Sequence, residues 1–428
     1  MEAAVSSTIG REIHELIGDL YPICRSITGN GYRQTMEMLQ RHVPLQVHEV
    51  PSGTQVFDWV VPREWNIRDA YVKDPAGRRV IDFGLSNLHV VGYSVPVHQT
   101  MSLESLRPHL FALPDRPDHI PYRTSYFQDS WGFCLSHRDY LSLEDCEYEV
   151  FIDSTLTEGS LTYGELYLPG TEETEVLISC HACHPSLCND NLSGIGVATM
   201  LAREVGATSH RLSYRFVFVP ATIGAITWLA ANEDRVSCVR HGLVLAGLGD
   251  PGAFTYKRSR RGNAAIDRVA VHVLRRCGVA FEAIDFDPFG YDQRQYCSPA
   301  FDLPVGGLSR TPYGMYPEYH TSADNLDFVT PGQLGESHRV LMEMFRALED
   351  NRTYVSLNPK CEPQLGKRGL YASLFGADER ALLWVLSQSD GNHDLLDISD
   401  KSGIEFGSIR EAARRLVTSD LLKPLPGL

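Results

Sequence analysis

The sequence has no apolar run long enough to cross a membrane. None of the hydrophobic stretches among its 428 residues approaches the roughly 20 residues that a membrane-spanning helix needs. The first helix-like stretch, Ile9–Leu20, carries Glu12, Glu15 and Asp19, which is unlike the apolar region of a secretory signal. We therefore expect no membrane partner.

An excess of basic residues is also missing. The chain has 39 Lys and Arg against 54 Asp and Glu, a formal net charge of -15 at pH 7. Because nucleic-acid binding needs a basic face, we expect no nucleic-acid partner. The ten cysteines are spread along the chain without a repeated pairing, so we expect reduced thiols and a cytoplasmic protein. We find no internal repeat, and the length predicts two or three domains.

Along the chain, a β-rich pattern gives way to an alternation of strands and helices. From about Val50 to Tyr148, short alternating runs, prolines and aromatic residues favour a β-rich module. After Ser160, strands alternate with helices, which is typical of a mostly parallel sheet covered on both faces. Beyond a helical start over residues 9–41, the predicted strands are Val176–Cys180, Tyr214–Val219 and Gly242–Ala246, and the predicted helices are Ile195–Val205, Asn263–Cys277 and Pro331–Leu348.

The last part of the chain is predicted to form a separate unit. Prolines and a glycine favour a linker over Asn351–Arg368. Three short helices are predicted behind it, over residues 378–388, 397–402 and 409–419, and they have the outline of a winged helix. Many such domains bind DNA, but the arginines of the expected recognition segment have acidic neighbours. We therefore favour docking or dimerisation, which makes a homo-oligomer possible.

Two segments carry the residues of a metal site. Residues 177–194 read LISCHACHPSLCNDNLSG, in which an apolar strand ends in two histidines and a polar turn. A further histidine follows more than a hundred residues later in EYHTSAD, residues 318–324. Imidazole and carboxylate groups beyond the ends of strands are typical ligands of a metal site with an open position. The two segments therefore indicate an enzyme.

These segments are similar to the motifs of the M28-type zinc exopeptidases, where Asp-Asn-x-Ser-Gly and His-Thr-x-x-Asp elements hold the metal. Longer stretches resemble the M28-like aminopeptidase family that was first described as a domain of unknown function: CHPSLCNDNLSG, PATIG, GDPGAFTYKRSRRGN and SPAFDLPVGGLSRTPYGMYPEYHTSADN. The resemblance covers nearly the whole chain.

The resemblance implies an α/β fold with a zinc-exopeptidase-like, mostly parallel sheet flanked by helices. It also implies an inserted β-rich domain and a C-terminal winged-helix domain. The expected parts are a discontinuous aminopeptidase core over residues 1–48 and 150–350, the insert over 49–149, and a winged-helix-like domain over 365–428.

The resemblance further implies the ligands of one or two zinc ions. Asp190 and His320 match the bridging aspartate and the last histidine of the family, with Asp324 supporting the ligands from behind. The first histidine is open, because His181 follows the strand directly whereas the Cys-His-Pro-Ser motif selects His184. We favour His184 as the ligand and His181 as a residue that lines the substrate pocket. The alternatives are a helix N-cap role for Asp190 and a buried structural role for His320.

The expected general base is missing. M28 peptidases carry a Glu-Glu pair after the next strand, but VPATIG has no carboxylate, and Ala221 stands where the resemblance leads us to expect glutamate. Glu318 is the available substitute, because in an extended segment it would point to the same side as His320. We predict that Glu318 is the catalytic carboxylate. The alternatives are a metal ligand, a carboxylate that binds a substrate ammonium, and a surface carboxylate.

Other polar residues are candidates for the substrate pocket. Asp292 falls near the Ser-Asp-His segment of M28 enzymes, as a substrate-binding carboxylate or a turn residue, and Gln293 beside it replaces an expected acidic residue. Asp250 is either a metal ligand or a turn residue before proline. Arg310 is predicted to bind a substrate carboxylate through a bidentate pair.

The cysteines near the first motif allow a different interpretation. Cys180 and Cys183 have the spacing of a zinc knuckle, and Cys188 lies near by. A closed structural zinc site needs four ligands, and the sequence has no second CxxC pair. We therefore favour buried thiols over a structural zinc site.

The sequence supports two functions of different classes. In the first, the protein is a zinc-dependent aminopeptidase or amidase that acts on a small peptide or amino-acyl conjugate, and the insert narrows the pocket. In the second, it is a catalytically disabled pseudo-peptidase that binds a peptide-like ligand or a partner protein. Ala221 is the residue that separates the two hypotheses.

Overall fold

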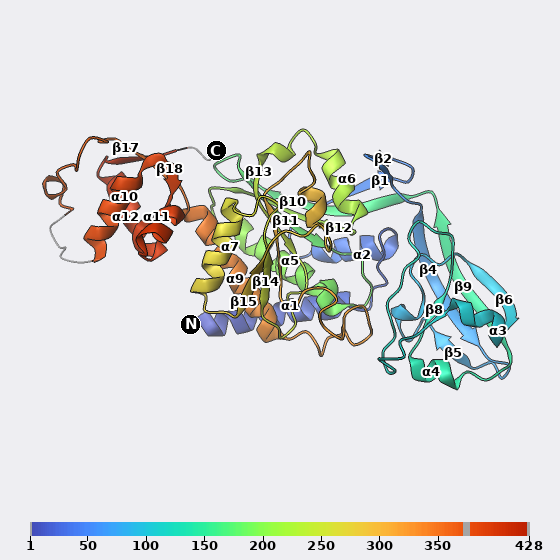
Figure 1. The fold of residues 1–428 in the computed structure, drawn as a ribbon. Helices are drawn as coiled ribbons and strands as arrows, with labels where there is room; N and C mark the ends of the chain where they lie inside the picture. The colour runs from blue at the N-terminus through green and yellow to red at the C-terminus, as the bar shows by residue number, and fades with distance from the viewer. Residues whose placement is uncertain (1, 371–376, 426–428) are drawn as a thin grey trace.

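The computed structural model describes residues 2–370 and 377–425, without the side chains of residues 2–7, 377 and 378. Residues 371–376 and 426–428 of the expected winged-helix domain lie outside it. Three parts follow one another in space, with the insert at one end, the core in the middle and the C-terminal part at the other end (Figure 1). In the described residues, no helix has the length and apolar character of a membrane span.

The core is built on one sheet of eight strands. In spatial order these are β1 (Gln46–Pro51), β10 (Ser160–Leu168), β12 (Ser213–Val219), β11 (Glu175–His181), β13 (Val239–Leu245), β16 (Val305–Ser309), β14 (Phe254–Lys257) and β15 (Phe281–Ile284). The four strands from β12 to β16 are parallel. The pairs β1–β10, β10–β12 and β16–β14 are antiparallel, and β14 and β15 are again parallel. Every residue of β11 and β12 is buried, as expected for the centre of a parallel sheet.

Helices cover this sheet in two groups. The first contains α1 (Glu2–Leu20), α5 (Ser193–Gly206), α7 (Ala265–Arg276) and α9 (Pro331–Asp350), and the second contains α6 (Ile223–Ala231) and α8 (Gln293–Tyr296). A further helix, α2 (Asn30–Leu39), packs on β10. The predicted strands lie in β11, β12 and β13, and the predicted helices lie in α5, α7 and α9, so the α/β fold class is confirmed.

The insert has a sheet and an apolar core of its own. Its strands β5 (Arg79–Asp82), β4 (Glu64–Lys73), β9 (Glu147–Thr157) and β6 (Val97–Ser102) are antiparallel in this order. Since β9 pairs with β4 as far as Thr157, this sheet extends beyond the predicted end at residue 149. The smaller elements are β2 (Gln55–Val56), β3 (Trp59–Val60), α3 (Leu103–Leu106), β7 (Leu110–Phe111), β8 (Phe133–Cys134) and α4 (His137–Ser142).

The C-terminal part contains α10 (Ala377–Gln388), α11 (Leu395–Ser402), α12 (Phe406–Thr418) and the sheet β18-β17-β19. Strand β17 (Thr353–Ser356) lies between β18 (Asp390–Asp394) and β19 (Leu422–Pro424). The expected linker over 351–368 is therefore wrong for residues 353–356. Thr-Tyr-Val-Ser is rich in β-branched and aromatic residues that favour a strand, and the prolines and glycine behind it obscured this signal.

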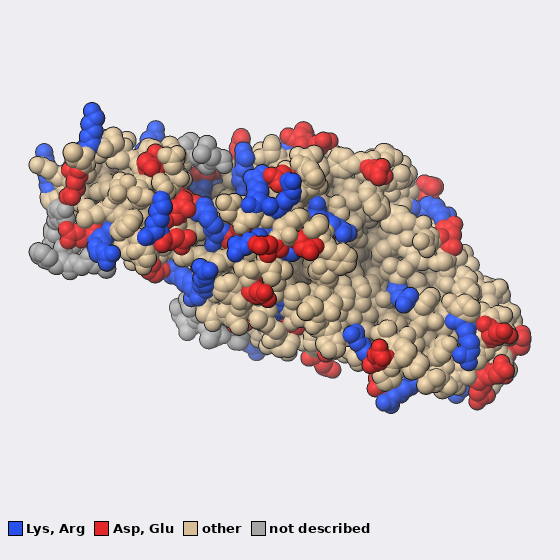
Figure 2. Space-filling model, in the orientation of Figure 1, with Lys and Arg blue, Asp and Glu red and all other residues tan. Residues whose placement is uncertain are grey.

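Ion pairs hold the C-terminal part against the core. Arg268 of α7 donates to Asp394 at 2.6 Å and to Asp397 at 2.5 Å, where α11 begins. Arg410 of α12 donates to Asp350 at the end of α9 at 2.6 Å. The buried apolar residues of the two parts form one continuous cluster. Lys and Arg are interspersed with Asp and Glu over this junction in Figure 2, without a continuous basic patch on the face shown.

Replacing Arg268 tests this docking. Its side chain is 29% exposed, so we expect Arg268→Ala to lower the free energy of unfolding by about 1–3 kcal/mol, between the values of exposed and buried ion pairs. Urea unfolding followed by circular dichroism measures this. Arg414→Ala is the control, because Arg414 is 68% exposed and pairs with Glu411 on its own helix. Equal stability of the two variants would contradict the docking role.

Candidate functional site

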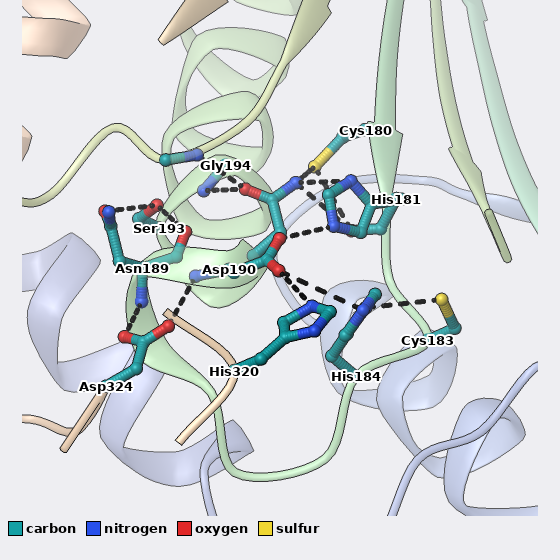
Figure 3. A network of polar contacts seen from close by, with 12 residues as sticks. Cys180, His181, Cys183, His184, Asn189, Asp190, Ser193, Gly194, His320 and Asp324 are labelled. Atoms are coloured by element: carbon teal, nitrogen blue, oxygen red, sulfur yellow. Dashed lines mark hydrogen bonds and ion pairs between the residues drawn. The ribbon is translucent and has the colours of Figure 1, made fainter. Parts of the chain in front are cut away.

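The site lies around the buried carboxylate of Asp190, shown in Figure 3. His181 Nε2 donates to Asp190 Oδ1 at 2.8 Å, and His320 Nε2 donates to Oδ2 at 3.0 Å. His184 Nε2 lies 4.0 Å from the same Oδ2. The candidate donor atoms of His181, His184 and Asp190 all lie within 4.8 Å of one another. Three imidazole rings therefore surround one carboxylate.

These residues lie at a strand end, in a turn and in loops from different parts of the chain. His181 ends β11, and His184 lies in the loop behind it. Asp190 lies in the irregular turn Cys188–Leu192, which leads into α5. His320 lies in the loop between β16 and α9 with φ 53°, a left-handed conformation that costs a non-glycine residue about 1–3 kcal/mol. The surrounding structure must hold His320 in this conformation.

The NDNLSG motif fixes the turn before α5 with its own polar side chains. Asn191 Nδ2 donates to Leu245 O at 2.9 Å, which joins the turn to the end of β13. Ser193 Oγ donates to Asn189 O at 2.8 Å and accepts from Leu248 N at 2.9 Å. The N-cap of α5 is Leu192, without a side-chain bond, so the helix-cap alternative for Asp190 is wrong.

Asp324 supports the same turn from below. Its carboxylate accepts from the backbone N–H groups of Asn189 at 2.5 Å and Asp190 at 3.0 Å, and its carbonyl accepts from Cys188 N at 3.0 Å. Burial raises the pKa of Asp324 to about 8, and the charge on Asp190 adds to this, whereas the backbone bonds oppose it. Asp324 thus orients Asp190 through the backbone, without a bond to any of the histidines.

The surroundings set the charges of the cluster. Burial alone would raise the pKa of Asp190, but the electrostatic interaction with His184 and the bonds from His181 and His320 outweigh it and hold this pKa well below its usual value. Burial lowers the pKa of His184 to about 3. An ionised carboxylate and a neutral imidazole are the protonation states that a metal ion requires of its ligands.

Asp292 is a second buried carboxylate near the cluster. It precedes α8, is 1% exposed, and neither of its oxygens has a hydrogen-bond partner. Burial raises its pKa to about 6, while the charges of His181 and Arg294 act in the opposite direction. Buried carboxylates without partners are rare and costly, so Asp292 is suited to a bound cation.

The side chains of Arg310 and Asp250 are both engaged in hydrogen bonds with other parts of the protein. The guanidinium of Arg310 donates to Gly252 O at 2.7 Å, to Ser337 Oγ at 3.3 Å and to Glu336, and it lies over the ring of Phe254. All three of its nitrogens are engaged, which contradicts the expected substrate contact.

The Asp250 carboxylate is likewise engaged in hydrogen bonds with neighbouring residues. It accepts from Thr311 Oγ1 at 2.6 Å, Gly252 N at 2.8 Å and Asn189 Nδ2 at 3.0 Å, which favours the turn alternative. Gln293, which replaces the expected acidic residue, donates to Val305 O at 2.9 Å and Arg258 O at 2.8 Å.

The extended segment that we expected for Glu318 is wrong. Residues 317–320 form a turn, and the left-handed φ of His320 breaks the alternation that would place both side chains on one side. The Glu318 carboxylate is half-buried and makes no bond or ion pair with another side chain among the described residues. Ala221 lies just beyond the end of β12, beside β11, and places no carboxylate there.

No cysteine belongs to a group of candidate metal ligands among the described residues. Among the described residues, the only group of three or more candidate ligands is His181, His184 and Asp190. Burial raises the pKa of Cys183 to about 12 and that of Cys180 well above its usual value, which keeps both side chains as neutral thiols when no metal is bound. The structure thus offers no support for the structural zinc alternative.

Several aromatic residues at the site carry no motif and were not predicted. Tyr122 of the insert lies against the rings of His184 and His320, with centroids 5.0 and 5.1 Å away. Tyr291 stacks on His181 at 5.3 Å. Tyr291 also lines an adjoining cavity of about 330 Å³, together with residues that include Val244, Ile284, Leu308, Pro312, Tyr313 and Met315. This cavity would suit an apolar side chain.

The buried guanidinium of Arg25 is another contribution that sequence reasoning missed. Its Nε donates to the carbonyl of His184 at 3.1 Å, and its Nη1 donates to Leu20 O at 2.6 Å. Arg25 thereby connects the first helix of the core to the loop that carries His184. The only signal was an arginine within the predicted helical start over residues 9–41, which is not specific.

The chain is similar in sequence and in structure to known proteins. A relative from Clostridium acetobutylicum is 51% identical over 423 residues, which covers 98% of this chain and 97% of the relative. It is named for polysaccharide biosynthesis and an aminopeptidase-like domain. A 2.37 Å crystal structure of a protein from the same species, named as a peptidase, matches with a TM-score of 0.93 at 50% identity and covers 99% of this chain and 98% of that one.

More distant structures share the fold. A zinc aminopeptidase from Bacillus subtilis matches with a TM-score of 0.57 at 11% identity, covering 78% of this chain and 94% of that one. This confirms the expected exopeptidase-like fold.

Two family models divide the chain between them. One described as "Domain of unknown function (DUF4910)" matches residues 14–351, and one for a winged helix-turn-helix matches residues 352–424, which confirms the C-terminal winged helix. The chain therefore belongs to the DUF4910 family, whose domain here has an aminopeptidase-like fold and is followed by a winged helix.

Proposed function

We propose that the protein is a zinc-dependent aminopeptidase or amidase. It would hydrolyse an amide bond next to a free amino group in a small peptide or amino-acyl conjugate. The observation that carries this proposal is the convergence of three imidazole rings and the Asp190 carboxylate at the carboxyl ends of parallel strands. Active sites of open α/β sheets lie at this edge.

The donor atoms of the site fit a zinc ion. Imidazole nitrogens and carboxylate oxygens are the ligands of catalytic zinc sites, and the cluster contains both without a thiolate. His184, Asp190 and His320 would hold the ion, and His181, which already donates to Asp190, is a further candidate. Asp292 is too deeply buried for a direct substrate contact, so we propose that it accommodates a second cation near His181.

Bound zinc would supply a Lewis acid that polarises the amide carbonyl. Residues of the protein itself would bind the substrate. Tyr291 and the apolar cavity of about 330 Å³ would receive a side chain of the substrate, and Tyr122 would close the opposite wall. The name of the Clostridium relative favours an amino-acyl intermediate of polysaccharide biosynthesis over peptides in general.

The site lacks a carboxylate at the position where the resemblance predicts the proton-transfer group. Ala221 offers no carboxylate, and Glu318 remains our candidate for moving the proton, because its carboxylate is free and lies two residues from His320. General acid–base groups contribute about 100- to 10,000-fold to a rate. The residue at position 221 therefore also favours a second function, a disabled pseudo-peptidase that binds a peptide-like ligand.

Replacing Asp190 tests the metal site. We expect the purified protein to bind zinc, and Asp190→Asn to weaken zinc binding by more than about 100-fold, because even residues behind the ligands contribute about 10- to 100-fold. Competition with a chromophoric chelator measures the affinity. Asp285→Asn is the control, since this side chain is 97% exposed. A wild-type protein without zinc affinity, or equal affinities of the two variants, would refute the proposal.

The His181→Gln and His184→Gln variants, measured in the same titration, identify the first ligand. We expect the larger loss of affinity from His184→Gln, as the sequence motif predicts. A larger loss from His181→Gln would instead assign that role to the residue that donates to Asp190.

Introducing a carboxylate at position 221 distinguishes the hydrolase hypothesis from the pseudo-peptidase hypothesis. On a panel of aminoacyl p-nitroanilides, we expect slow wild-type hydrolysis that Glu318→Gln abolishes, and a gain of about 100-fold or more in kcat/KM from Ala221→Glu. A zinc-bound wild type without turnover, together with an active Ala221→Glu variant, would instead establish the pseudo-peptidase. If neither protein turns over any substrate, the hydrolase proposal fails.

A further inference from the structure

One short segment of the insert, residues 120–122, reaches the cluster of His184, Asp190 and His320. Tyr122 N donates to His320 O at 2.8 Å, and Ser322 N donates to Ile120 O at 2.9 Å. Ile120 N donates to Ser322 Oγ at 3.0 Å, and Pro121 and Thr321 form an antiparallel bridge. The loop that carries His320 is therefore paired with a strand-like segment of another domain. We call residues 120–122 the strap.

The strap also places an aromatic ring between two candidate ligands. The ring of Tyr122 is perpendicular to that of His320, at 88°, and inclined by 53° to that of His184. Centroid distances of 5.0 and 5.1 Å are typical of favourable aromatic pairs. His184 and His320 lie 136 residues apart in the sequence, and one side chain limits the rotation of both.

The ring of Tyr122 is itself held in place by the insert and the core. Its hydroxyl lies 3.1 Å from that of Tyr126, whose ring packs perpendicular to Tyr93 at 5.3 Å. The Tyr93 hydroxyl lies 2.5 Å from Thr28 Oγ1, which also accepts from Trp65 N at 3.0 Å. A continuous line of contacts thus runs from the loop between α1 and α2 through the insert to the histidines.

We propose that the insert completes the metal site and that Tyr122 is its positioning residue, setting the ring orientations of His184 and His320. This inference rests on the proposed metal-binding function. It assigns the insert a role beyond narrowing the pocket, because His320 has a left-handed backbone and its carbonyl is bonded to the strap. A metal ion requires fixed ring directions, and residues that orient ligands contribute about 10- to 100-fold to affinity.

The test measures metal binding by full-length protein. We expect Tyr122→Leu to weaken zinc affinity about tenfold or more in a chelator competition, and to shift or broaden the visible absorption bands of the cobalt-substituted protein. Tyr122→Phe keeps the ring and is expected to stay within about threefold of the wild type. Tyr140→Leu, in helix α4 of the insert, is the matched control and should bind like the wild type.

Circular dichroism first establishes that each variant folds. If Tyr122→Leu does not fold, Ser322→Ala replaces it. This change removes the acceptor of Ile120 N, and we expect it to weaken zinc binding about threefold or more. Wild-type affinity and an unchanged cobalt spectrum in the folded variant would overturn the inference, as would an equal loss from Tyr140→Leu. If the wild type binds no zinc, the proposed function and this inference fail together.

Discussion

The whole site is organised around one buried carboxylate. Asp190 is removed from solvent and stays ionised because imidazole groups donate to both of its oxygens. Such a charge is costly unless it is paired, so the surrounding chain must deliver the partners with little freedom. Asn191, Ser193 and Asp324 do this by fixing the turn, and the parallel strands bring the histidines to the same edge. The NDNLSG motif thus specifies a backbone shape as much as a set of ligands.

The added domains differ in how they relate to the core. The insert has its own apolar core, yet it extends a strap to the His320 loop and an aromatic ring to two histidines. The winged helix shares the apolar core of the peptidase-like part and is tied to α7 and α9 by ion pairs. In an HTH domain, the start of the second helix contacts the bases of DNA. Here Phe406, at the start of α12, lies against His272 of the core, which agrees with the docking role expected from the sequence.

The sequence predicted the elements that follow from local patterns. Strands β11, β12 and β13 contain the apolar runs Val176–Ile178, Phe216–Val219 and Leu243–Leu245, which made the sheet predictable. Asp190 and His320 stand in motifs with defined spacing, which made the cluster predictable. The geometry expected for Glu318 was wrong because it assumed extended backbone, whereas residues 317–320 form a turn and His320 has a left-handed φ. Arg310 failed because its charge alone does not reveal that Glu336 and Gly252 already occupy it. The roles of Tyr122 and Arg25 could not be predicted, because their contacts join residues that are far apart in the sequence. Tyr122 lies 62 positions from His184 and 198 from His320, and Arg25 lies 159 positions from His184.

The central claim is that nitrogen and oxygen atoms of this cluster, and no sulfur, bind a metal ion. X-ray absorption spectroscopy at the zinc edge of the zinc-loaded protein tests it most directly. The account predicts a nearest shell of nitrogen and oxygen at about 2.0–2.1 Å with the multiple scattering of at least two imidazole rings. A shell of sulfur near about 2.3 Å would place the metal on the cysteines and contradict the account.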